Sequence, residues 1–255
     1  MILYGDYHTH TIYSRNHHGK GTILENASVA ADKGLKQIAI TDHGFNHEFF
    51  SVRRKLIPQI QEEILNAKEI TGVDILLGVE ANLISLEGDV DVKEEDLQYL
   101  DVLLMGYHKL VHMKSLKDKM QLNFSNNVVV KIFGPSKERI SRNTTAMLKA
   151  IDKYPIDVIT HLNFGFQTDT IAVAKLAKQK GVFVELNGKH INFTSDEIEI
   201  MKAEGIKFIV NSDAHTPDRV GEVNRGMNTV YKYNIPISQV VNIDKLPKFN
   251  KKRGF

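Results

Sequence analysis

The chain has 255 residues, of which 42% are hydrophobic and 25% charged, values that are ordinary for a globular protein. Its formal net charge of +2 does not favour nucleic-acid binding through bulk charge. The sequence contains no cysteine, so disulfides and thiolate metal sites are excluded, and a bound metal would need His, Asp or Glu ligands. No apolar run reaches the length of a membrane span and no signal peptide is recognisable, so we expect a cytoplasmic protein.

Seven short apolar runs recur along the chain and are predicted to be strands. Runs of this kind, which suit burial on both faces, are typical of parallel sheets. They cover residues 2–4, 38–42, 75–79, 102–105, 156–159, 182–186 and 206–210.

Helical patterns separate most of these runs. Apolar residues recur every three or four positions between residues 52 and 70, and residues 171–177 give a shorter version of this pattern. Thr194 or Ser195 is expected to cap a helix that begins with acidic residues. A glycine follows each of four helical patterns, where its left-handed conformation would end the helix. These glycines are Gly34, Gly72, Gly181 and Gly205.

The alternation of strands and helices predicts right-handed crossovers and a parallel sheet. Seven such units favour an irregular α/β barrel over a doubly wound sheet, and no glycine-rich phosphate loop follows the first strand. We expect one domain over residues 1–245 and a basic, solvated tail over residues 246–255. Residues 109–135 do not fit this alternation, and we predict a long loop there, with or without a small hairpin, over one end of the barrel.

Side chains of the types that can bind metal ions, His, Asp and Glu, follow six of the seven predicted strands. In an extended strand alternate side chains share a face, so His8 and His10 point the same way. In a parallel barrel all carboxyl ends of strands meet at one mouth, where such enzymes place their chemistry. Burying many ionisable groups together is costly unless they are paired or bound to metal. The residues concerned are His8, His10, Asp42, His43, Glu80, His108, His161, Asp213 and His215.

Three other histidines, His47, His112 and His190, do not follow a predicted strand directly, and we treat them as non-ligands. The sixth predicted strand ends in Glu185, Leu186 and Asn187, which offer polar groups but no histidine.

Taken together, these motifs resemble those of the PHP (polymerase and histidinol phosphatase) family, in the family's order and over nearly the whole chain. The resemblance implies a distorted seven-stranded (βα)7 TIM-like barrel with up to three metal ions. Family members include histidinol-phosphate phosphatases, other phosphoesterases, tyrosine phosphatases and polymerase-associated nuclease domains, and the compact length is most similar to the stand-alone phosphatases. The matching motifs are His8-x-His10-Thr11, Thr41-Asp42-His43, Glu80, His108, His161 and Asp213-Ala214-His215.

The resemblance implies three divalent metal ions, and His/Asp/Glu ligand sets accept Zn, Mn and Fe alike. Glu80 would bridge the first two ions. Their other ligands would be His8, His10 and Asp213 at the first site, and His108 and His161 at the second.

The third site would be held by His43, His215 and a histidine from the loop after the first strand. In that loop we favour His18 over His17, because the following glycine lets the backbone turn and present the ring. Asp42 is expected to orient a ligand histidine from behind.

Closely spaced divalent ions suit phosphoryl transfer, because they activate water and neutralise the phosphate. We therefore expect hydrolysis of a phosphate monoester on a small substrate, with histidinol phosphate among the candidates, through attack by a metal-bridging hydroxide. Glu80, Asp213 and Asp42 are counted among the catalytic groups.

A cation should also contact the substrate phosphate. The candidates are Arg15, Lys20, Arg142, Lys189 and Arg219. Arginine binds phosphate through two parallel hydrogen bonds, so the three arginines rank above the two lysines.

Three other functions remain open. A nuclease of the same family ranks second, because lysines of residues 109–137 supply some positive charge, although the chain has no Trp and few aromatic residues there for base stacking. An amidohydrolase-like enzyme ranks third, since such enzymes often bridge their metals with a carboxylated lysine, whose place Glu80 takes here. A metal-binding protein without turnover fits less well, because structural sites are usually closed and mononuclear.

Overall fold

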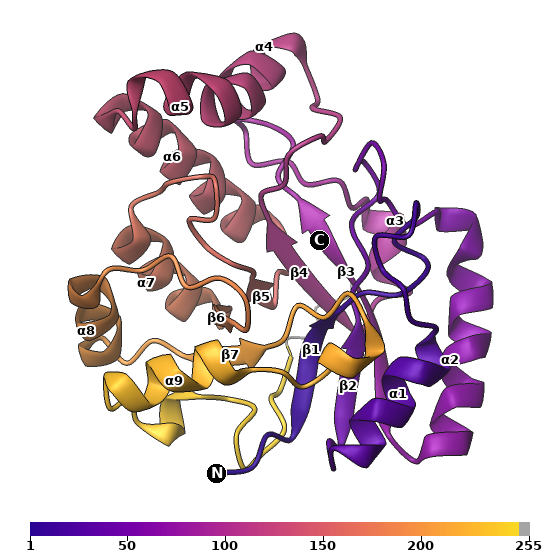
Figure 1. The fold of residues 1–255 in the computed structure, drawn as a ribbon. Coiled ribbons are helices and arrows are strands. Elements are labelled where there is room, and N and C mark those ends of the chain that lie inside the picture. Colours follow the sequence, from indigo (N-terminus) through magenta and orange to yellow (C-terminus); the bar gives the residue numbers. More distant parts are fainter. Residues whose placement is uncertain (250–255) are drawn as a thin grey trace.

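The strands of the protein form one parallel sheet in chain order, wound into a nearly closed barrel (Figure 1). The computed structural model describes residues 1–249. Thr9 and Ala214 form a parallel bridge at the seam between the first and last strands. The strands are β1 Gly5–Thr9, β2 Gln37–Ile40, β3 Asp74–Asn82, β4 Val102–Gly106, β5 Val158–Ile159, β6 Phe183–Asn187 and β7 Phe208–Asn211.

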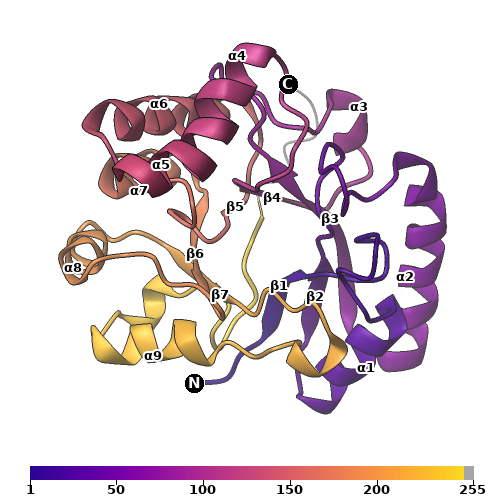
Figure 2. The same cartoon turned by 45° about the horizontal axis from the view of Figure 1, so that its top comes forward.

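Helices surround the strands as an outer ring (Figure 2). The predicted (βα)7 TIM-like barrel is confirmed. Among residues 1–249, no helix combines the length and hydrophobicity needed to cross a bilayer. The α-helices are α1 Ile23–Asp32, α2 Ile57–Thr71, α3 Glu94–Leu97, α4 Leu116–Asp118, α5 Val130–Phe133, α6 Lys137–Lys153, α7 Thr170–Lys180, α8 Ser195–Ala203 and α9 Asn224–Lys232. The 3-10 helices are η1 Arg54–Leu56, η3 Pro217–Arg219 and η4 Ile237–Gln239, and η2 Lys119–Val129 is π-helical.

The predicted ends of several helices are confirmed. Thr194 caps α8 and forms a reciprocal capping box with Glu197, which satisfies backbone N–H groups at the start of the helix. Gly72 and Gly181 end α2 and α7 with φ of 71° and 72°, the left-handed region that glycine adopts without a steric penalty.

The barrel interior has an apolar half and a polar half. Inward-facing side chains near the amino ends of the strands form an apolar cluster of Tyr7, Ala39, Val102, Leu104, Val158, Ile209 and Val241. Two residues further along β2, β5 and β7, the inward positions hold the buried polar residues Thr41, Thr160 and Asn211. Because side chains alternate along a strand, this change of polarity places the polar groups at the carboxyl ends.

A bulge in β1 brings its first histidine into this polar half. Asp6 pairs with Ile38 and Thr9 with Ile40, so two residues of β1, Tyr7 and His8, lie opposite one residue of β2. Both side chains are therefore directed inward: Tyr7 joins the apolar cluster, and His8 lies beside Glu80.

The prediction of a long loop over residues 109–135 is wrong. This segment contains α4, η2 and α5, which lie together near the carboxyl ends of β4 and β5 (Figure 1). Its inward side is held by polar contacts: Arg142 on α6 donates to the carbonyl of Gln121 at 2.7 Å and to the hydroxyl of Ser125 at 2.9 Å.

The predicted basic tail, residues 246–255, lies largely outside the described residues. Within the described part, the Phe249 ring contacts the Tyr7 ring edge-to-face, with centroids 5.0 Å apart. Phe249 thus packs against the apolar cluster inside the barrel. The boundary at residue 245 stays a prediction.

Candidate metal centre

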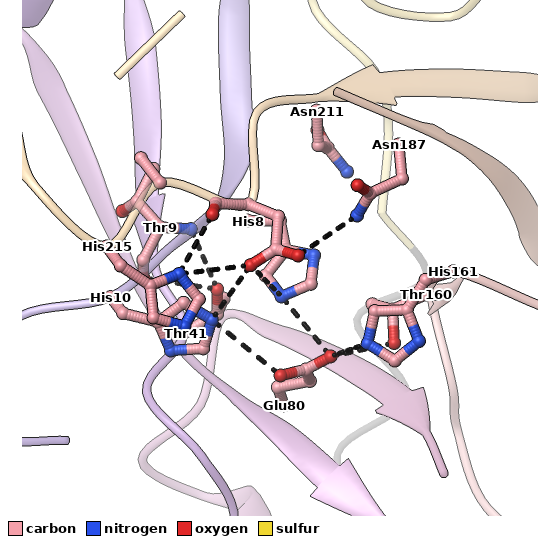
Figure 3. Close-up of polar contacts among 12 residues, drawn as sticks. His8, Thr9, His10, Thr41, Glu80, Thr160, His161, Asn187, Asn211 and His215 are labelled. Atoms are coloured by element: carbon pink, nitrogen blue, oxygen red, sulfur yellow. Dashed lines mark hydrogen bonds and ion pairs between the residues drawn. The ribbon is translucent and has the colours of Figure 1, made fainter. Parts of the chain in front are cut away.

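The predicted ligands from separate strand ends converge at the mouth of the barrel (Figure 3). They lie beside a cavity of about 330 Å³. Three groups of side chains each place their donor atoms within 4.8 Å of one another. The groups are His8, His10 and Asp213; His43, Glu80 and His108; and His10, His43 and His215.

Glu80 lies at the centre of the cluster, fully buried on β3. Its Oε1 atom is 2.8 Å from Nε2 of His161, 3.2 Å from Nε2 of His8 and 3.3 Å from Nε2 of His108. Its other oxygen, Oε2, is 3.1 Å from Nδ1 of His43. Burial raises the pKa of Glu80, but the surrounding histidines lower it well below its ordinary value. An ionised carboxylate with both oxygens surrounded by imidazoles is suited to bridging two cations.

Asp213 faces Glu80 across the cluster. Its Oδ1 atom is 3.5 Å from Nε2 of His10 and 3.8 Å from Nε2 of His8. Asp213 and His161 have φ of 55° and 29°, in the left-handed region that residues other than glycine rarely adopt. Such strained backbone concentrates at functional sites, where the surrounding structure holds it in place.

Several nitrogen and oxygen atoms that could bind a metal ion make no hydrogen bond to any group among residues 1–249. They are Nε2 of His8 and His10, Nδ1 of His43 and Oε2 of Glu80, and all four are buried. A buried polar atom without a partner is costly. Burial also lowers the pKa of His10 and His43 well below the ordinary value, which leaves their rings neutral, with lone pairs free to bind a cation. The residues present therefore fit divalent metal ions.

Glu185 on β6 is a part of this site that the sequence analysis did not assign. Its Oε1 atom is 2.8 Å from Nδ1 of His8, and its Oε2 accepts the backbone N–H of His161 at 2.8 Å. Asn187 and Asn211 donate to the same carboxylate. A carboxylate on the far nitrogen of a ligand histidine fixes the orientation of its ring. The only signal in the sequence was an acidic residue on a strand otherwise expected to be apolar.

Asp42 acts on His10 through a hydroxyl group. The Oγ of Ser14 donates to Oδ1 of Asp42 at 2.6 Å and lies 3.3 Å from Nδ1 of His10. Thr11 donates to Asp42 through both its backbone N–H and its hydroxyl. Burial raises the pKa of Asp42 to about 6, while these hydrogen bonds oppose the rise. Asp42 therefore contacts the predicted ligand His10 indirectly, through the hydroxyl group of Ser14.

A second oriented histidine is His108, whose Nδ1 lies 2.7 Å from Oδ1 of Asn82. In the loop after β1, Nε2 of His18 lies 2.9 Å from Nε2 of His215, and the His18 ring stacks on Phe50. His17 is exposed. The geometry brings His18, and not His17, to the cluster.

The predicted phosphate-binding arginines do not line the cavity. Arg142 is held by η2, Arg219 pairs with Glu222 at 3.2 Å, and Arg15 donates to Ser51. Lys189, which ranked below them, lines the cavity, with Nζ 3.3 Å from Oδ1 of Asp213 and 2.7 Å from Nδ1 of His215. Lys109 also lines it. The three arginines meet partners elsewhere in the fold, and which cation binds the phosphate stays a prediction.

The three histidines treated as non-ligands occupy different places. His112 is exposed, with Nδ1 3.8 Å from Oε1 of Glu48. His47 and His190 line the cavity. Nδ1 of His47 accepts the backbone N–H of Phe50 at 3.2 Å, so the other ring nitrogen carries its proton.

Comparison with known proteins bears on this constellation of residues. The family model described as PHP domain matches residues 6–189, which include most of the predicted ligands. The chain belongs to the PHP domain family. The predicted family is thus confirmed.

Relatives of this PHP chain extend over nearly its whole length. A probable phosphatase from Caldanaerobacter subterraneus subsp. tengcongensis is 32% identical over 260 residues, covering 96% of this chain and 89% of that protein. A probable phosphatase from Aliivibrio fischeri is 28% identical over 256 residues, covering 94% and 90%. These names agree with the predicted enzyme class.

The fold of this PHP chain is shared with solved structures of low sequence identity. A histidinol phosphate phosphatase from Lactococcus lactis, solved with zinc, L-histidinol and phosphate, gives a TM-score of 0.67 at 16% identity and covers all of both chains. A putative histidinol phosphatase from Listeria monocytogenes gives a TM-score of 0.61 at 15% identity and covers 85% of this chain and 97% of that one. At such identities the likeness shows the fold alone.

Proposed function

We propose that this PHP domain is a metal-dependent phosphatase that hydrolyses small phosphate monoesters. The observation that carries the proposal is the buried cluster of unpartnered histidine and carboxylate donors around Glu80, beside a cavity with Lys189 on its wall. The curated relatives, named probable phosphatases, support the reaction class. The cavity volume of about 330 Å³ is at the small end of the range for small-molecule pockets, which favours a small monoester over a nucleic acid.

The ligand assignment in this proposal has three sites. Glu80 would bridge the first two, as its position among the histidines suggests. The remaining ligands would be His8, His10 and Asp213; His108 and His161; and His18, His43 and His215. Divalent ions at these sites, Zn, Mn or Fe, would lower the pKa of a bound water to about 7 and neutralise the phosphate charge.

The protein's own groups position this chemistry. Glu185 holds the ring of His8, Asn82 holds that of His108, and Ser14 with Asp42 holds that of His10. Lys189 would contact a phosphate oxygen, because its ammonium group is the cation nearest to Asp213 and His215 among the cavity-lining residues. A substrate resembling histidinol phosphate is one candidate, because the Lactococcus protein of similar fold is a histidinol phosphate phosphatase. A cytoplasmic location stays a prediction.

The test is phosphate release from a panel of monoesters by the full-length chain, with metal content measured on the same sample. We expect release that depends on added Mn²⁺ or Zn²⁺ and that falls about 10³-fold or more in Asp213→Asn, as for removal of a central catalytic group. Arg219→Ala is the matched control, since this side chain lies away from the cavity, and it should retain activity. Absence of release across the panel by protein with confirmed bound metal would refute the proposal.

A further inference from the structure

A row of exposed apolar side chains runs along α4, η2 and α5. Five of them recur every four residues, a sixth follows directly, and their exposed fractions lie between 40% and 83%. Exposed apolar side chains that gather along one segment often mark interaction sites on folded proteins. We call this row the apolar ridge, and its members are Leu116, Met120, Phe124, Val128, Ile132 and Phe133.

The opposite side of the same segment faces the protein and is largely polar, apart from the fully buried Leu122. Asn126 is buried and exchanges hydrogen bonds with Asn143 on α6, at 2.8 and 3.2 Å. Asn127 donates to the hydroxyl of Tyr107 at 2.8 Å, and Ser125 accepts from Arg139 at 2.9 Å. An amphipathic helix on a protein surface normally has the reverse arrangement. Within residues 1–249 the ridge is therefore left uncovered and available to a partner.

The ridge is flanked by positive charge at both ends. Residues 109–137 contain six lysines and a single acid, Asp118, a formal charge of +6 − 1 = +5, against +2 for the whole chain, although Lys114 pairs with Asp89 and Lys109 lines the cavity. Asp118 is buried and accepts the backbone N–H of Leu86 and the hydroxyl of Ser115, so it does not offset charge at the surface. Lys117 and Lys119 lie near one end of the ridge.

Lys131 and Lys137 lie near the other end, and all four of these lysines are exposed. Two copies of the ridge paired about a twofold axis would bring lysines against lysines, which opposes self-association. A ridge of long apolar side chains with lysines at both ends matches instead the acyl and headgroup layers of a membrane surface. We propose that the apolar ridge binds the surface of bilayers that contain anionic lipids.

This binding would place the barrel mouth close to the membrane. Lys109 and Leu110 line the metal-cluster cavity, and the ridge begins six residues later at Leu116. Tyr107, on the cavity wall, donates its hydroxyl to the carbonyl of Leu122 in η2 at 3.2 Å. The inner side of η2 thus contacts the cavity wall, although the proposal does not depend on the activity of the site.

The test is co-sedimentation of the full-length chain with vesicles. We expect binding to vesicles of phosphatidylcholine with phosphatidylglycerol, and weak binding to phosphatidylcholine alone. The double variant Ile132→Ser and Phe133→Ser should bind about tenfold or more weakly, because two inserted side chains are lost. The matched control is Leu65→Ser and Ile70→Ser on α2, whose side chains are 67% and 61% exposed, and it should bind as the wild type does.

A second pair of variants tests the role of charge. Lys119→Gln with Lys131→Gln should reduce binding to the anionic vesicles, whereas Lys36→Gln with Lys55→Gln, exposed lysines elsewhere, should not. Circular dichroism checks that every variant is folded. Three results would overturn the proposal: no vesicle binding by the wild type, unchanged binding after loss of Ile132 and Phe133, or a wild-type dimer that the ridge variant dissociates.

Discussion

The ring of His8 is held on one side by Glu185 and faces Glu80 and Asp213 on the other, and this makes Glu185 a positioning residue for the proposed metal centre. In Glu185→Gln, metal affinity should fall about 10- to 100-fold, as is typical when a carboxylate behind a ligand histidine is lost. Competition with a chromogenic chelator measures the affinity, and circular dichroism monitors the fold. Glu87→Gln, an exposed ion-pair residue, is the control. Equal affinities in wild type and Glu185→Gln would contradict this role.

Lys189 is the residue for which the structure changes the prediction of phosphate binding. Lys189→Ala should raise KM for a monoester about tenfold, because one charge-assisted hydrogen bond to phosphate is lost. Metal content should stay unchanged. Arg142→Ala removes a charge that lies against η2, so it should leave KM unaltered. If Arg142→Ala raised KM and Lys189→Ala did not, the assignment would be reversed.

Asp89 gives a stability prediction that depends on pH. Burial raises its pKa, but hydrogen bonds from Lys114, Lys153 and Ser85 lower it below the ordinary value. A carboxyl with a lowered folded-state pKa stabilises the protein above its unfolded pKa of about 3.9 and loses this contribution as pH falls through the folded pKa. Urea unfolding should therefore show a deficit of Asp89→Asn relative to wild type at neutral pH that shrinks below about pH 4. Exposed Asp32→Asn is the control, and a deficit independent of pH would count against the ion pairs.

At the scale of single residues, the sequence predicted which metal-binding side chains lie at strand ends. It did not predict the side chains that hold those ligands in position. His8, Glu80 and Asp213 could be predicted because parallel strands share a mouth, whatever the details of packing. Glu185 could not, because a carboxylate in an apolar run does not reveal which ring it meets. Lys189 and Arg142 were ranked by chemistry alone, and the direction of a long side chain is set by tertiary contacts.

Among the elements, the helix–glycine–strand units were predicted correctly because helix ends follow local rules. Residues 109–135 were not, because the segment does not fit the alternation of strands and helices and was predicted to be a loop. In α4, η2 and α5 most apolar residues face solvent, although Leu122 is fully buried, and polar residues such as Asn126 and Asn127 face inward. The four-residue repeat from Leu116 to Ile132 is present in the sequence, but a loop was predicted over this segment.

The carboxyl end of β4 depends on a residue without a side chain. A Cβ added to Gly106 would lie 2.4 Å from Oγ1 of Thr160 and 2.9 Å from Cε1 of His161. Gly106→Ala should push His161 away from Glu80, lower metal affinity, and cost about 1–3 kcal/mol of stability through overpacking. Elemental analysis and thermal unfolding measure the two effects.

The control for this prediction is Gly205→Ala, where φ is 70° and the nearest atom to an added Cβ is Nζ of Lys178 at 3.8 Å. It should cost about 1 kcal/mol through backbone strain and leave metal binding unchanged. If the two variants lost metal equally, the effect of Gly106→Ala would be general destabilisation and not displacement of His161.

For the whole molecule, metal binding should be coupled to folding. The donor atoms of His8, His10, His43 and Glu80 are buried without hydrogen-bond partners among residues 1–249, so a cation that binds them should stabilise the folded state. Metal at 100 times its Kd should add about 2.7 kcal/mol to the free energy of unfolding. Thermal unfolding before and after chelation measures this, and Asp213→Asn should respond less. A Tm unaffected by chelation of protein with measured bound metal would contradict the coupling.

The barrel itself was predictable at this scale because seven repeated units and a shared mouth leave few alternative topologies. Its interior was not, since the sequence does not show which residue of β1 is additional. The bulge directs both Tyr7 and His8 inward, Tyr7 into the apolar half of the barrel and His8 into the polar half.

The bulge has a consequence for how ions and solvent could enter the barrel interior. The Tyr7 ring fills part of the apolar half of the barrel interior, next to the His8 imidazole in the polar half. Deletion of Tyr7 would remove the bulge and straighten β1, while His8 and His10 would still point inward. Such a deletion would remove the aromatic side chain that fills the apolar half of the interior. We therefore expect the irregularity to serve closure of the interior more than alignment of the histidines, so that ions and solvent would reach the cluster through the mouth.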